Sequence, residues 1–384
     1  MGSLNFAQIS GQRGRPLGKI DASLNEKLKN VEWGEYTYDR LFSTVAVKRK
    51  LSRSDVSTDG RTPIFSSESE NNGIMGYTDQ KPDYHVDEKT PIYLIFCDHT
   101  RNFCIASMDF CVADNVKILE PKVPLSKRQL LYITSAWKKC IENKGYARHW
   151  GTAKSVRFLL PAKNGEIDFD FMESFIAELE AEQLYKLDDY LAVTGLKDTT
   201  LTEDEEKALN TYESMVFNDY KLTDVFDVAN AGNILSRDIR EGSGTTPYLC
   251  ASAENNAVSS YISYDEKQKN EGNCIFIGGK TFVVTYQQYD FYSNDSHNIT
   301  LRLKDTNYKT RNTQLYLVSC VYKSLNALYS WGDSISYKKA QNNIISLPTK
   351  DGNIDYAGMS ILISAIQKLV IKNVVAYSNE KSEQ

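Results

Sequence analysis

The 384-residue chain contains one long sequence pattern twice. Between residues 33–73 and 217–257 the same features recur 184 positions apart, including Leu-Ser-Arg, Thr-Pro and Glu-Asn-Asn, so that Arg53 corresponds to Arg237. A period of this length is the size of a domain and far longer than the repeats of a solenoid. The sequence therefore predicts two tandem copies of one domain.

The match continues beyond that block with small changes of offset. Pairs at offsets of 181 and then 187 positions are Asp109-Phe110 with Asp290-Phe291, Trp150-Gly151 with Trp331-Gly332, Leu160-Pro161 with Leu347-Pro348, and Gly165–Met172 with Gly352–Met359. These changes of offset mean that a few residues were inserted or deleted between the copies, which proteins tolerate best in surface loops. We interpret both Trp-Gly pairs as structural features of the domain.

Each copy is predicted to be rich in strands and to carry an amphipathic helix. Short apolar or alternating runs between turn residues predict strands over about 36–118 and 220–303. Helices are predicted near 126–144, with Ser126 as the capping residue, and near 312–329. The predicted fold class is therefore mixed α/β.

A long helix is predicted after each copy. Asp168 and Asp355 stand at helix starts and are followed by apolar residues in an i, i+3, i+4, i+7 pattern over roughly 25 residues, or about 38 Å. The first continues past Gly195 into a second helical stretch, where Thr202 and Glu205 form a predicted capping box. Since an apolar stripe outside a globular domain needs a partner, we expect the two long helices to pack as an antiparallel, coiled-coil-like spacer.

The predicted segments share the net charge of −5 unequally. They are an N-terminal arm over 1–30, a first domain over 31–162, a helical connector over 163–216, a second domain over 217–350 and a C-terminal helix over 351–384. Residues 166–214 hold 15 Asp/Glu and 3 Lys, a balance of −12, so the rest of the chain carries −5 + 12 = +7. Two mildly basic domains can hold a basic face suited to nucleic acid, although +7 also fits an ordinary surface.

Composition favours a cytoplasmic protein with reduced thiols. The seven cysteines form no C-x-x-C pair, and their odd number suits free thiols. The sequence has no run of about 18 apolar residues and no signal-peptide pattern. We therefore expect no membrane association.

Motifs for catalysis and metal binding are missing from the sequence. The four histidines are scattered, without H-E-x-x-H or Cys/His ligand spacing, which predicts no metal site. The segment Phe276–Thr281 is similar to a phosphate-binding loop, but Cys274 stands where the first glycine would be, so we interpret it as a strand followed by a glycine turn. The chain has no G-x-S-x-G motif, and it has no Pro-Pro pair of the kind that amino-methylating enzymes use. We expect no catalytic residues.

The order of the repeated motifs resembles a known family. The aromatic block, Thr-Pro followed by Glu-Asn-Asn, Asp-Phe, Trp-Gly, and Leu-Pro before Gly-x-Ile-Asp-x-x-x-Met resemble the specificity (S) subunits of restriction–modification systems, from about residue 31 to 378. The helix starts at Gly165–Met172 and Gly352–Met359 look most like the two-subunit type II systems that cut on both sides of their site. They are also similar, more loosely, to type I specificity subunits.

The resemblance implies a protein that recognises DNA without performing chemistry. Each copy would be a target-recognition domain that reads one half of a split double-stranded DNA sequence, and the long helices would space the two domains. The helices would also dock methyltransferase or fused methyltransferase–nuclease subunits, which would hold S-adenosylmethionine and magnesium. With these partners the complex would be a DNA adenine methyltransferase and endonuclease, whereas this chain would need no cofactor.

Candidate DNA contacts are of two kinds. Phosphate contacts are expected from the cations Lys48, Arg49, Lys50, Arg53, Lys154, Arg157, Arg237, Arg240, Lys280, Lys338 and Lys339. Base contacts are expected from Ser67, Asn71, Asn72, Arg101, Asn255, Asn256, Tyr286 and Gln287, since Asn and Gln suit adenine edges and Arg suits guanine. The repeated Asn pairs can equally be turn residues that serve backbone geometry.

Two other classes of protein stay open at this point. One is the recognition half of a fused restriction–methyltransferase enzyme, whose catalytic part would lie elsewhere. The other is a duplicated module that binds something other than DNA, such as carbohydrate, which the 24 tyrosines would suit. The free thiols and the acidic helical connector fit that second alternative poorly.

Overall fold

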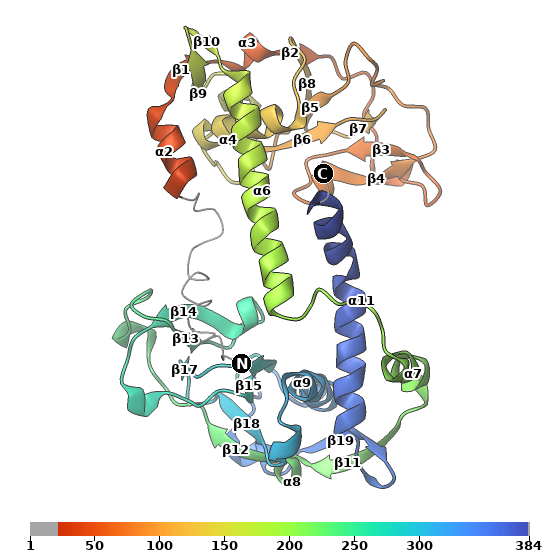
Figure 1. Ribbon diagram of the computed structural model, residues 1–384, viewed down its shortest axis with the longest axis vertical. Helices are drawn as coiled ribbons and strands as arrows, with labels where there is room; N and C mark the ends of the chain where they lie inside the picture. Colours follow the sequence, from red (N-terminus) through yellow and green to blue (C-terminus); the bar gives the residue numbers. More distant parts are fainter. Residues whose placement is uncertain (1–21, 383–384) are drawn as a thin grey trace. The chain divides into compact units, whose positions relative to one another are not determined.

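The computed structural model describes residues 22–382 (Figure 1). These residues form two compact units, one ending at Lys186 and the other beginning at Leu187. Each unit contains one copy of the sequence repeat and is described here by itself.

The N-terminal unit is built from short strands and one central helix. Its strands are β1 (Glu32–Tyr36), β2 (Phe42–Val45), β3 (Thr62–Phe65), β4 (Ile74–Thr78), β5 (Tyr93–Cys97), β6 (Asn102–Ala106), β7 (Cys111–Val112), β8 (Val116–Pro121), β9 (Phe158–Lys163) and β10 (Glu166–Ile167). Its helices are α2 (Ala22–Asn30), α3 (Tyr38–Leu41), α4 (Lys127–Cys140), α5 (Trp150–Ala153) and α6 (Phe169–Val193), with 3-10 turns η1 (Arg53–Asp55) and η2 (Asn71–Gly73). The last residues of α6 belong to the other unit.

Three small sheets organise this unit. Their strand orders are β2-β8-β5-β6, β4-β3-β7 and β1-β9-β10. All pairs are antiparallel except β3 and β7, where Ile64 lies opposite Cys111 in a parallel bridge. Trp137 of α4 is fully buried, and its ring stacks with those of Phe42, Phe96 and Phe158. The core of the unit is therefore aromatic.

The C-terminal unit repeats this arrangement. Its strands are β11 (Val216–Lys221), β12 (Phe226–Asn230), β13 (Thr246–Leu249), β14 (Val258–Ile262), β15 (Cys274–Gly278), β16 (Val283–Gln287), β17 (Tyr292–Ser293), β18 (Ile299–Leu303), β19 (Ile344–Lys350) and β20 (Asn353–Ile354). Its helices are α7 (Glu203–Thr211), α8 (Leu222–Val225), α9 (Arg311–Leu325), α10 (Tyr337–Ala340) and α11 (Tyr356–Ser382); the 3-10 turns are η3 (Tyr212–Ser214), η4 (Ser236–Asp238), η5 (Asn255–Ala257), η6 (Glu266–Gln268), η7 (Thr306–Tyr308) and η8 (Asn326–Leu328).

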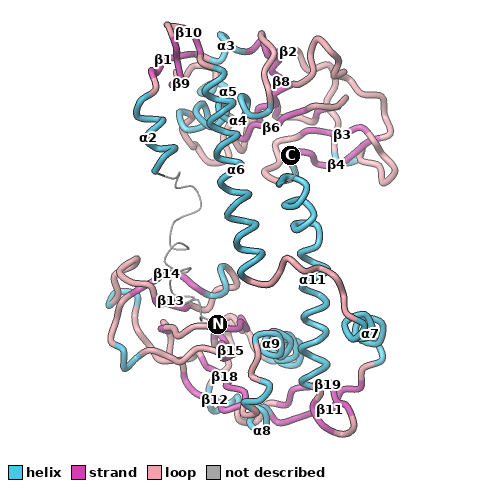
Figure 2. The backbone as a smooth tube through the Cα atoms, viewed as in Figure 1, coloured by secondary structure: helices cyan, strands magenta, loops and turns pink. Residues whose placement is uncertain are grey.

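The sheets of the second unit have the same strand orders as those of the first. They are β12-β18-β15-β16, β14-β13-β17 and β11-β19-β20, and the parallel pair recurs between β13 and β17. Figure 2 shows the short strands of each unit alongside the long helices α6 and α11, of 25 and 27 residues. The predicted mixed α/β fold, with two tandem strand-rich domains each followed by a long helix, is confirmed.

The predicted helix starts are also confirmed. Ser126 Oγ accepts a hydrogen bond from the Gln129 N–H at the start of α4. Asp168 and Asp355 do the same one turn into α6 and α11, at 2.9 and 2.8 Å. These bonds satisfy N–H groups that have no partner within the helix. Helix α4 ends at Cys140, earlier than the predicted 144.

The described part of the structure covers only residues 22–30 of the N-terminal arm predicted over 1–30. Residues 22–30 of that segment form helix α2, and Leu24 is buried in the aromatic core of the unit. Lys27 of the same helix forms an ion pair with Glu178 of α6. The helix therefore belongs to the folded domain, and residues 1–21 lie outside the described part of the chain.

Helix α11 is packed into the second unit through its first half. Met359 and Ala365 are fully buried, and the helix contacts both α9 and α7. At its far end Ser378 donates a 3.5 Å hydrogen bond to Asp188 in the last turns of α6. Among the described helices, α11 is the one long and apolar enough to cross a membrane by length and composition, with a mean hydropathy of 1.5. Of its apolar window, 22% is buried.

Candidate DNA interface

Four loops meet at one end of the first domain, which we call loop end 1 (residues 66–73, 98–101, 113–115 and 141–149). Ser67 Oγ accepts a 3.0 Å hydrogen bond from the N–H of His99. The N–H of Asp98 donates to the carbonyl of Asn115 at 2.9 Å. Arg101 donates to the carbonyl of Ile141 at 2.8 Å. These contacts bring the predicted residues Ser67 and Arg101 to the same end of the domain.

The second domain has the equivalent arrangement, loop end 2 (residues 250–257, 279–282, 294–298 and 326–336). Thr281 donates to the carbonyl of Ala251 at 2.8 Å. Gly279 N–H donates to the side chain of Asn298 at 3.0 Å. The ring of Phe282 stacks on Tyr329 at 5.3 Å. The duplication therefore extends from the sheets to the way that their loops meet.

A basic segment follows the amphipathic helix of the first domain. Residues 138–154 carry five exposed cations against the single carboxylate of Glu142: Lys138, Lys139, Lys144, Arg148 and Lys154. Part of this segment forms loop end 1, so its charge lies beside Ser67 and Arg101. Sequence reasoning selected only Lys154, although a charge count over this window would have found the others. A cluster of this kind attracts phosphate.

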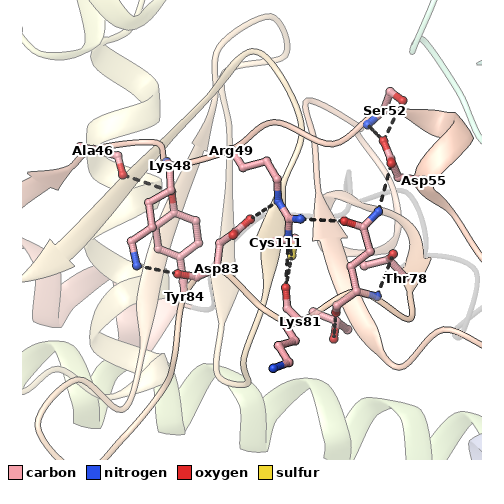
Figure 3. Close-up of polar contacts among 12 residues, drawn as sticks. Ala46, Lys48, Arg49, Ser52, Asp55, Thr78, Lys81, Asp83, Tyr84 and Cys111 are labelled. Atoms are coloured by element: carbon pink, nitrogen blue, oxygen red, sulfur yellow. Dashed lines mark hydrogen bonds and ion pairs between the residues drawn. The ribbon is translucent and has the colours of Figure 1, made fainter.

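Lys48 and Arg49 are predicted to contact phosphate, but in the structure they form hydrogen bonds to other residues of their own domain (Figure 3). The Arg49 guanidinium donates to Asp83, to Gln80 and to the Lys81 carbonyl at 2.7–3.1 Å. The Asp83 carboxylate, through a direct hydrogen bond, raises the pKa of Arg49. Lys48 donates to the Asp83 carbonyl at 2.9 Å and lies over the Tyr84 ring. This network ties the segment after β2 to the segment before β5.

Most of the other predicted cations form surface ion pairs within their own domain. The pairs are Lys50–Asp114, Arg53–Glu68, Arg157–Glu35, Arg237–Asp238, Lys280–Asp295 and Lys339–Asp333. Exposed pairs of this kind are weak, so a DNA phosphate can replace the carboxylate. Lys154, Arg240 and Lys338 are exposed and form no ion pair with any described residue.

Asp295 is the most strongly perturbed acid of loop end 2. Burial on its own would raise its pKa, but hydrogen bonds from Lys280 and His297 lower it to about 2. The carboxylate is therefore charged at neutral pH and holds the Lys280 ammonium at 2.7 Å. Lys280 is thus fixed at the tip of the β15–β16 hairpin.

The repeated Asn pairs have the geometry of turn residues. Asn71, Asn72, Asn255 and Asn256 all have φ between 47° and 51°, the left-handed region that Asn tolerates better than most side chains. The Asn72 side chain exchanges two hydrogen bonds with the backbone of Ile105, and Asn256 donates to the carbonyl of Tyr286. Their amide groups serve the backbone, which favours the turn interpretation over base contacts.

Tyr286 and Gln287 lie in the interior of the second domain. Both are buried on β16, with Tyr286 donating to Asn273 and Gln287 donating to the carbonyl of Asn256. Burial raises the pKa of Tyr286. Because neighbouring side chains on a strand point to opposite faces, the burial of both residues means that both faces of β16 are covered at this end. We therefore leave both residues out of the interface.

A shallow groove brings two of the predicted contacts together in the first domain. It is lined by Arg53, Val56, Glu68, Glu70, Asn71, Ile74 and Met75. Arg53 and Asn71 thus share one surface, and the two glutamates beside them could accept hydrogen bonds from a base amino group. Within residues 22–382 no cluster of three or more His, Cys, Asp or Glu side chains could hold a metal ion.

This arrangement defines a class of protein that binds through two similar loop-bearing domains. Comparison with known proteins identifies the class. The model of the type I restriction modification DNA specificity domain matches the chain twice, over residues 30–188 and 216–376. The chain belongs to this family, and it is a non-catalytic DNA specificity subunit of a restriction–modification system.

Relatives of known identity agree with the family assignment. The chain is 22% identical over 346 residues to the specificity subunit S.BcgI of a type II restriction enzyme from Heyndrickxia coagulans, a match covering 89% of this chain and 96% of that protein. Its fold is similar to the crystal structure of a type I restriction–modification S subunit from M. genitalium. That likeness has a TM-score of 0.57 at 13% identity and covers 92% of each chain.

Proposed function

We propose that each domain reads one half of a split double-stranded DNA target with its loop end. The observation that carries this proposal is the meeting of four equivalent loops in both domains, with exposed cations such as Lys154 and Lys338 on these loops or directly beside them. The loops differ in sequence while the sheets beneath them agree. Two domains of one design with different loops would read two different half-sites, so the target would be bipartite and asymmetric.

Exposed cations on the loop ends and elsewhere on the two domains would position the domains on phosphate. Those proposed are Lys50, Arg53, Lys144, Arg148, Lys154 and Arg157 in the first domain, and Arg237, Arg240, Lys280, Lys338 and Lys339 in the second. Ser67 and Arg101 are the proposed base contacts of the first domain. Phosphate contacts carry no sequence information, whereas contacts to base edges do.

The long helices would set the spacing of the two half-sites. A helix of 25 residues, the length of α6, is about 38 Å long, close to the roughly 34 Å of one DNA turn. Two half-sites one turn apart present the same groove on the same side of the duplex. A helix of this length would therefore be suited to separate two DNA-recognition domains by one turn of the duplex.

The same helices would dock the catalytic subunits. Helix α11 carries exposed apolar side chains at Ile366, Leu369 and Val370, the last of them 74% exposed. Methyltransferase or fused methyltransferase–nuclease subunits would cover such a surface and would bring S-adenosylmethionine and magnesium. Replacing Leu369 and Val370 with Glu should abolish association with these subunits. Intact association of this double variant would contradict the docking surface.

Sequencing of methylated sites in host DNA, with and without this gene, tests the central proposal. We expect a methylation motif of two short parts separated by unspecified bases, which disappears when the gene is deleted. Exchange of the loops of loop end 2 with those of a related subunit should change one part of the motif only. A continuous motif, or a change in both parts, would contradict a division of the target between the two domains.

A further inference from the structure

Two tryptophans at matching positions of the sequence repeat lie in opposite environments. Trp150 of the first domain is half-buried, with its ring 5.3 Å from that of Tyr38 and 5.6 Å from that of Phe96. Trp331, 181 positions later in the repeat, is 75% exposed and makes no ring contact or hydrogen bond with any described residue. The structural interpretation of the Trp-Gly pair thus fits the first copy only.

Trp331 has lost the aromatic partners that surround Trp150. The cluster of Tyr38, Phe96, Trp137 and Phe158 corresponds to Leu222, Ile277, Val321 and Ile345, where the helix positions are matched through the caps Ser126 and Thr310, 184 residues apart. An aliphatic core offers no stacking contact to an indole. The core of the second domain is complete without Trp331, since its buried positions are filled by these and other aliphatic side chains.

The polar anchor of Trp150 is missing in the second domain as well. The Asp98 carboxylate accepts hydrogen bonds from the backbone N–H groups of His149 and Trp150, at 2.7 and 2.6 Å. The residue equivalent to Asp98 is Gly279, which has no side chain to accept them. A side chain would not fit there, because a Cβ atom on Gly279 would lie 2.2 Å from the His297 carbonyl oxygen. The short helix α10 begins at Tyr337 as α5 begins at Trp150, so Tyr337 takes the equivalent position before the next strand and Trp331 lies outside it.

Trp331 and Gly332 lie at the tip of a tight turn. Ser330 and Asp333 exchange backbone hydrogen bonds of 3.1 and 3.3 Å across the turn. Lys339 braces it through an ion pair with Asp333 and a 2.9 Å hydrogen bond to the Ser334 carbonyl. A Cβ atom on Gly332 would have no neighbour within 4 Å, so the tip is open on that side. The indole of Trp331 is therefore exposed to solvent at the tip of a turn that Lys339 stabilises.

The first domain presents a different aromatic residue from the equivalent loop. Tyr146, in the segment that follows α4, is 88% exposed and stacks on His99 with ring centroids 4.5 Å apart. His99 stands at the β5–β6 hairpin position that Lys280 occupies in the second domain. Tyr146 and Trp331 are the most exposed large apolar side chains of the two loop ends. Each loop end thus combines one projecting ring with neighbouring cations.

We propose that Trp331 and Tyr146 contact the bases of the two half-sites, each ring packing against base faces or base edges in a groove of the duplex. A planar ring that protrudes from a supported turn can wedge against a base step at little cost in conformational entropy. Lys338, Lys339 and Lys280 near Trp331 favour DNA over an apolar protein surface as the partner, because they would meet phosphates beside the ring. This inference rests on the proposed role of the loop ends in DNA reading.

Binding of the full chain to DNA, alone and with its methyltransferase subunit, tests the inference. Trp331→Ala should weaken binding to a duplex carrying the methylation motif by about tenfold or more, while random DNA binds nearly as before and the salt dependence is unchanged. Trp331→Phe should recover most of the loss. Tyr261→Ala is the matched control, since Tyr261 is an exposed aromatic on β14, opposite Pro247 and away from the loops. Unchanged thermal unfolding would show that the variants fold.

Fluorescence adds a direct readout, because the difference in emission between the wild type and Trp331→Phe reports this indole. That difference should be quenched by motif DNA. If Trp331→Ala leaves motif binding unchanged while the removal of loop-end cations weakens it, this inference fails and the proposed function stands. If neither change affects DNA binding, the loop ends themselves are not the interface. Loss of methyltransferase association with unchanged DNA binding would overturn the inference in favour of a protein contact.

Discussion

The carboxylate of Asp98 and the backbone N–H of Trp150 are joined by a 2.6 Å hydrogen bond inside the first domain. The same carboxylate oxygen accepts from the N–H of His149, and the His149 ring is hydrogen bonded to the Asp98 carbonyl and to the N–H of Lys144. All three side chains are wholly or partly buried. This contact fixes the end of the basic segment 138–154 to the tip of the β5–β6 hairpin.

Removal of the Asp98 carboxylate should loosen that segment. In Asp98→Ala the Trp150 N–H loses its acceptor and the His149 N–H keeps only the main-chain carbonyl of residue 98, which we expect to lower the free energy of unfolding by about 1–3 kcal/mol. Affinity for DNA should fall too, because the cations lose their fixed positions. Asp98→Asn keeps one acceptor oxygen and should lose less. Urea unfolding and DNA titration of both variants measure the effect, and equal behaviour of Ala and Asn would contradict it.

The basic segment 138–154 should contribute to DNA affinity without specifying sequence. Replacing Lys144, Arg148 and Lys154 with Ala should weaken binding to all duplexes alike and flatten the plot of log K against log salt by about 0.9 for each lost phosphate contact. Lys29→Ala, on α2 outside the loop end, serves as a control for the loss of one positive charge. An altered sequence preference in the triple variant would indicate base contacts instead.

Arg49 and Arg53 should behave differently, although both were expected to contact phosphate. Arg49 is held by Asp83 and Gln80, so Arg49→Ala should chiefly destabilise the first domain through the lost charged hydrogen bonds. Arg53 pairs only with exposed Glu68, so Arg53→Ala should leave stability within about 0.5 kcal/mol and weaken DNA binding. Thermal unfolding and DNA binding, measured on both variants, separate the two roles. Equal stability of the two variants would show that the Arg49 network is not needed for the fold.

A buried ion pair between Glu205 and Lys368 should make the second unit sensitive to substitution. The carboxylate side chain is 7% exposed and receives hydrogen bonds from Lys368 at 2.9 Å and Ser364 at 2.6 Å. Lys368→Met leaves a buried charge unpaired and should cost about 3–5 kcal/mol of stability. The double variant with Glu205→Leu should recover much of this loss. A double variant no more stable than Lys368→Met would contradict the pairing.

The same pair predicts a pH dependence. Burial on its own would raise the pKa of Glu205, but hydrogen bonds from Ser364, Lys368 and the Thr202 N–H lower it to about 2 from an ordinary value near 4.5. A depressed pKa in the folded state stabilises the fold above about pH 4.5, and this contribution is lost as the pH falls toward 2. The wild type should therefore lose more stability than Glu205→Gln over that range. Chemical unfolding at pH 6, 4 and 3 measures the difference.

Local features of the fold could be predicted from the sequence because they depend on neighbouring residues. The caps at Ser126, Asp168 and Asp355 need only a side chain and an N–H three residues on, and all three form as predicted. The strand-then-turn interpretation of Phe276–Thr281 also holds, since β15 ends at Gly278. Helix α2 escaped prediction because its place in the core depends on Leu24 meeting residues far along the chain.

The candidate site was less predictable, because exposure of a polar or aromatic side chain depends on contacts between distant segments. Tyr286 and Gln287 carry the right chemistry for base contacts but are both buried at the end of β16, one on each face. Arg49 has the right charge, but its guanidinium donates hydrogen bonds within the domain to residues 31 to 34 positions further along the chain. Tyr146 and Arg148 were overlooked, because only the folded loops bring segment 138–154 beside Ser67 and Arg101.

The sequence by itself determined that this protein has two copies of one domain, a long capped helix after each, and a place in a family of DNA specificity subunits. Those properties follow from periodicity, spacing and motif order, which are written along the chain. Only the tertiary structure decided which of the two tryptophans that match in the sequence repeat is exposed. Trp150 and Trp331 have the same Gly neighbour, but burial is set by partners such as Asp98 or Gly279 that approach from elsewhere in the fold.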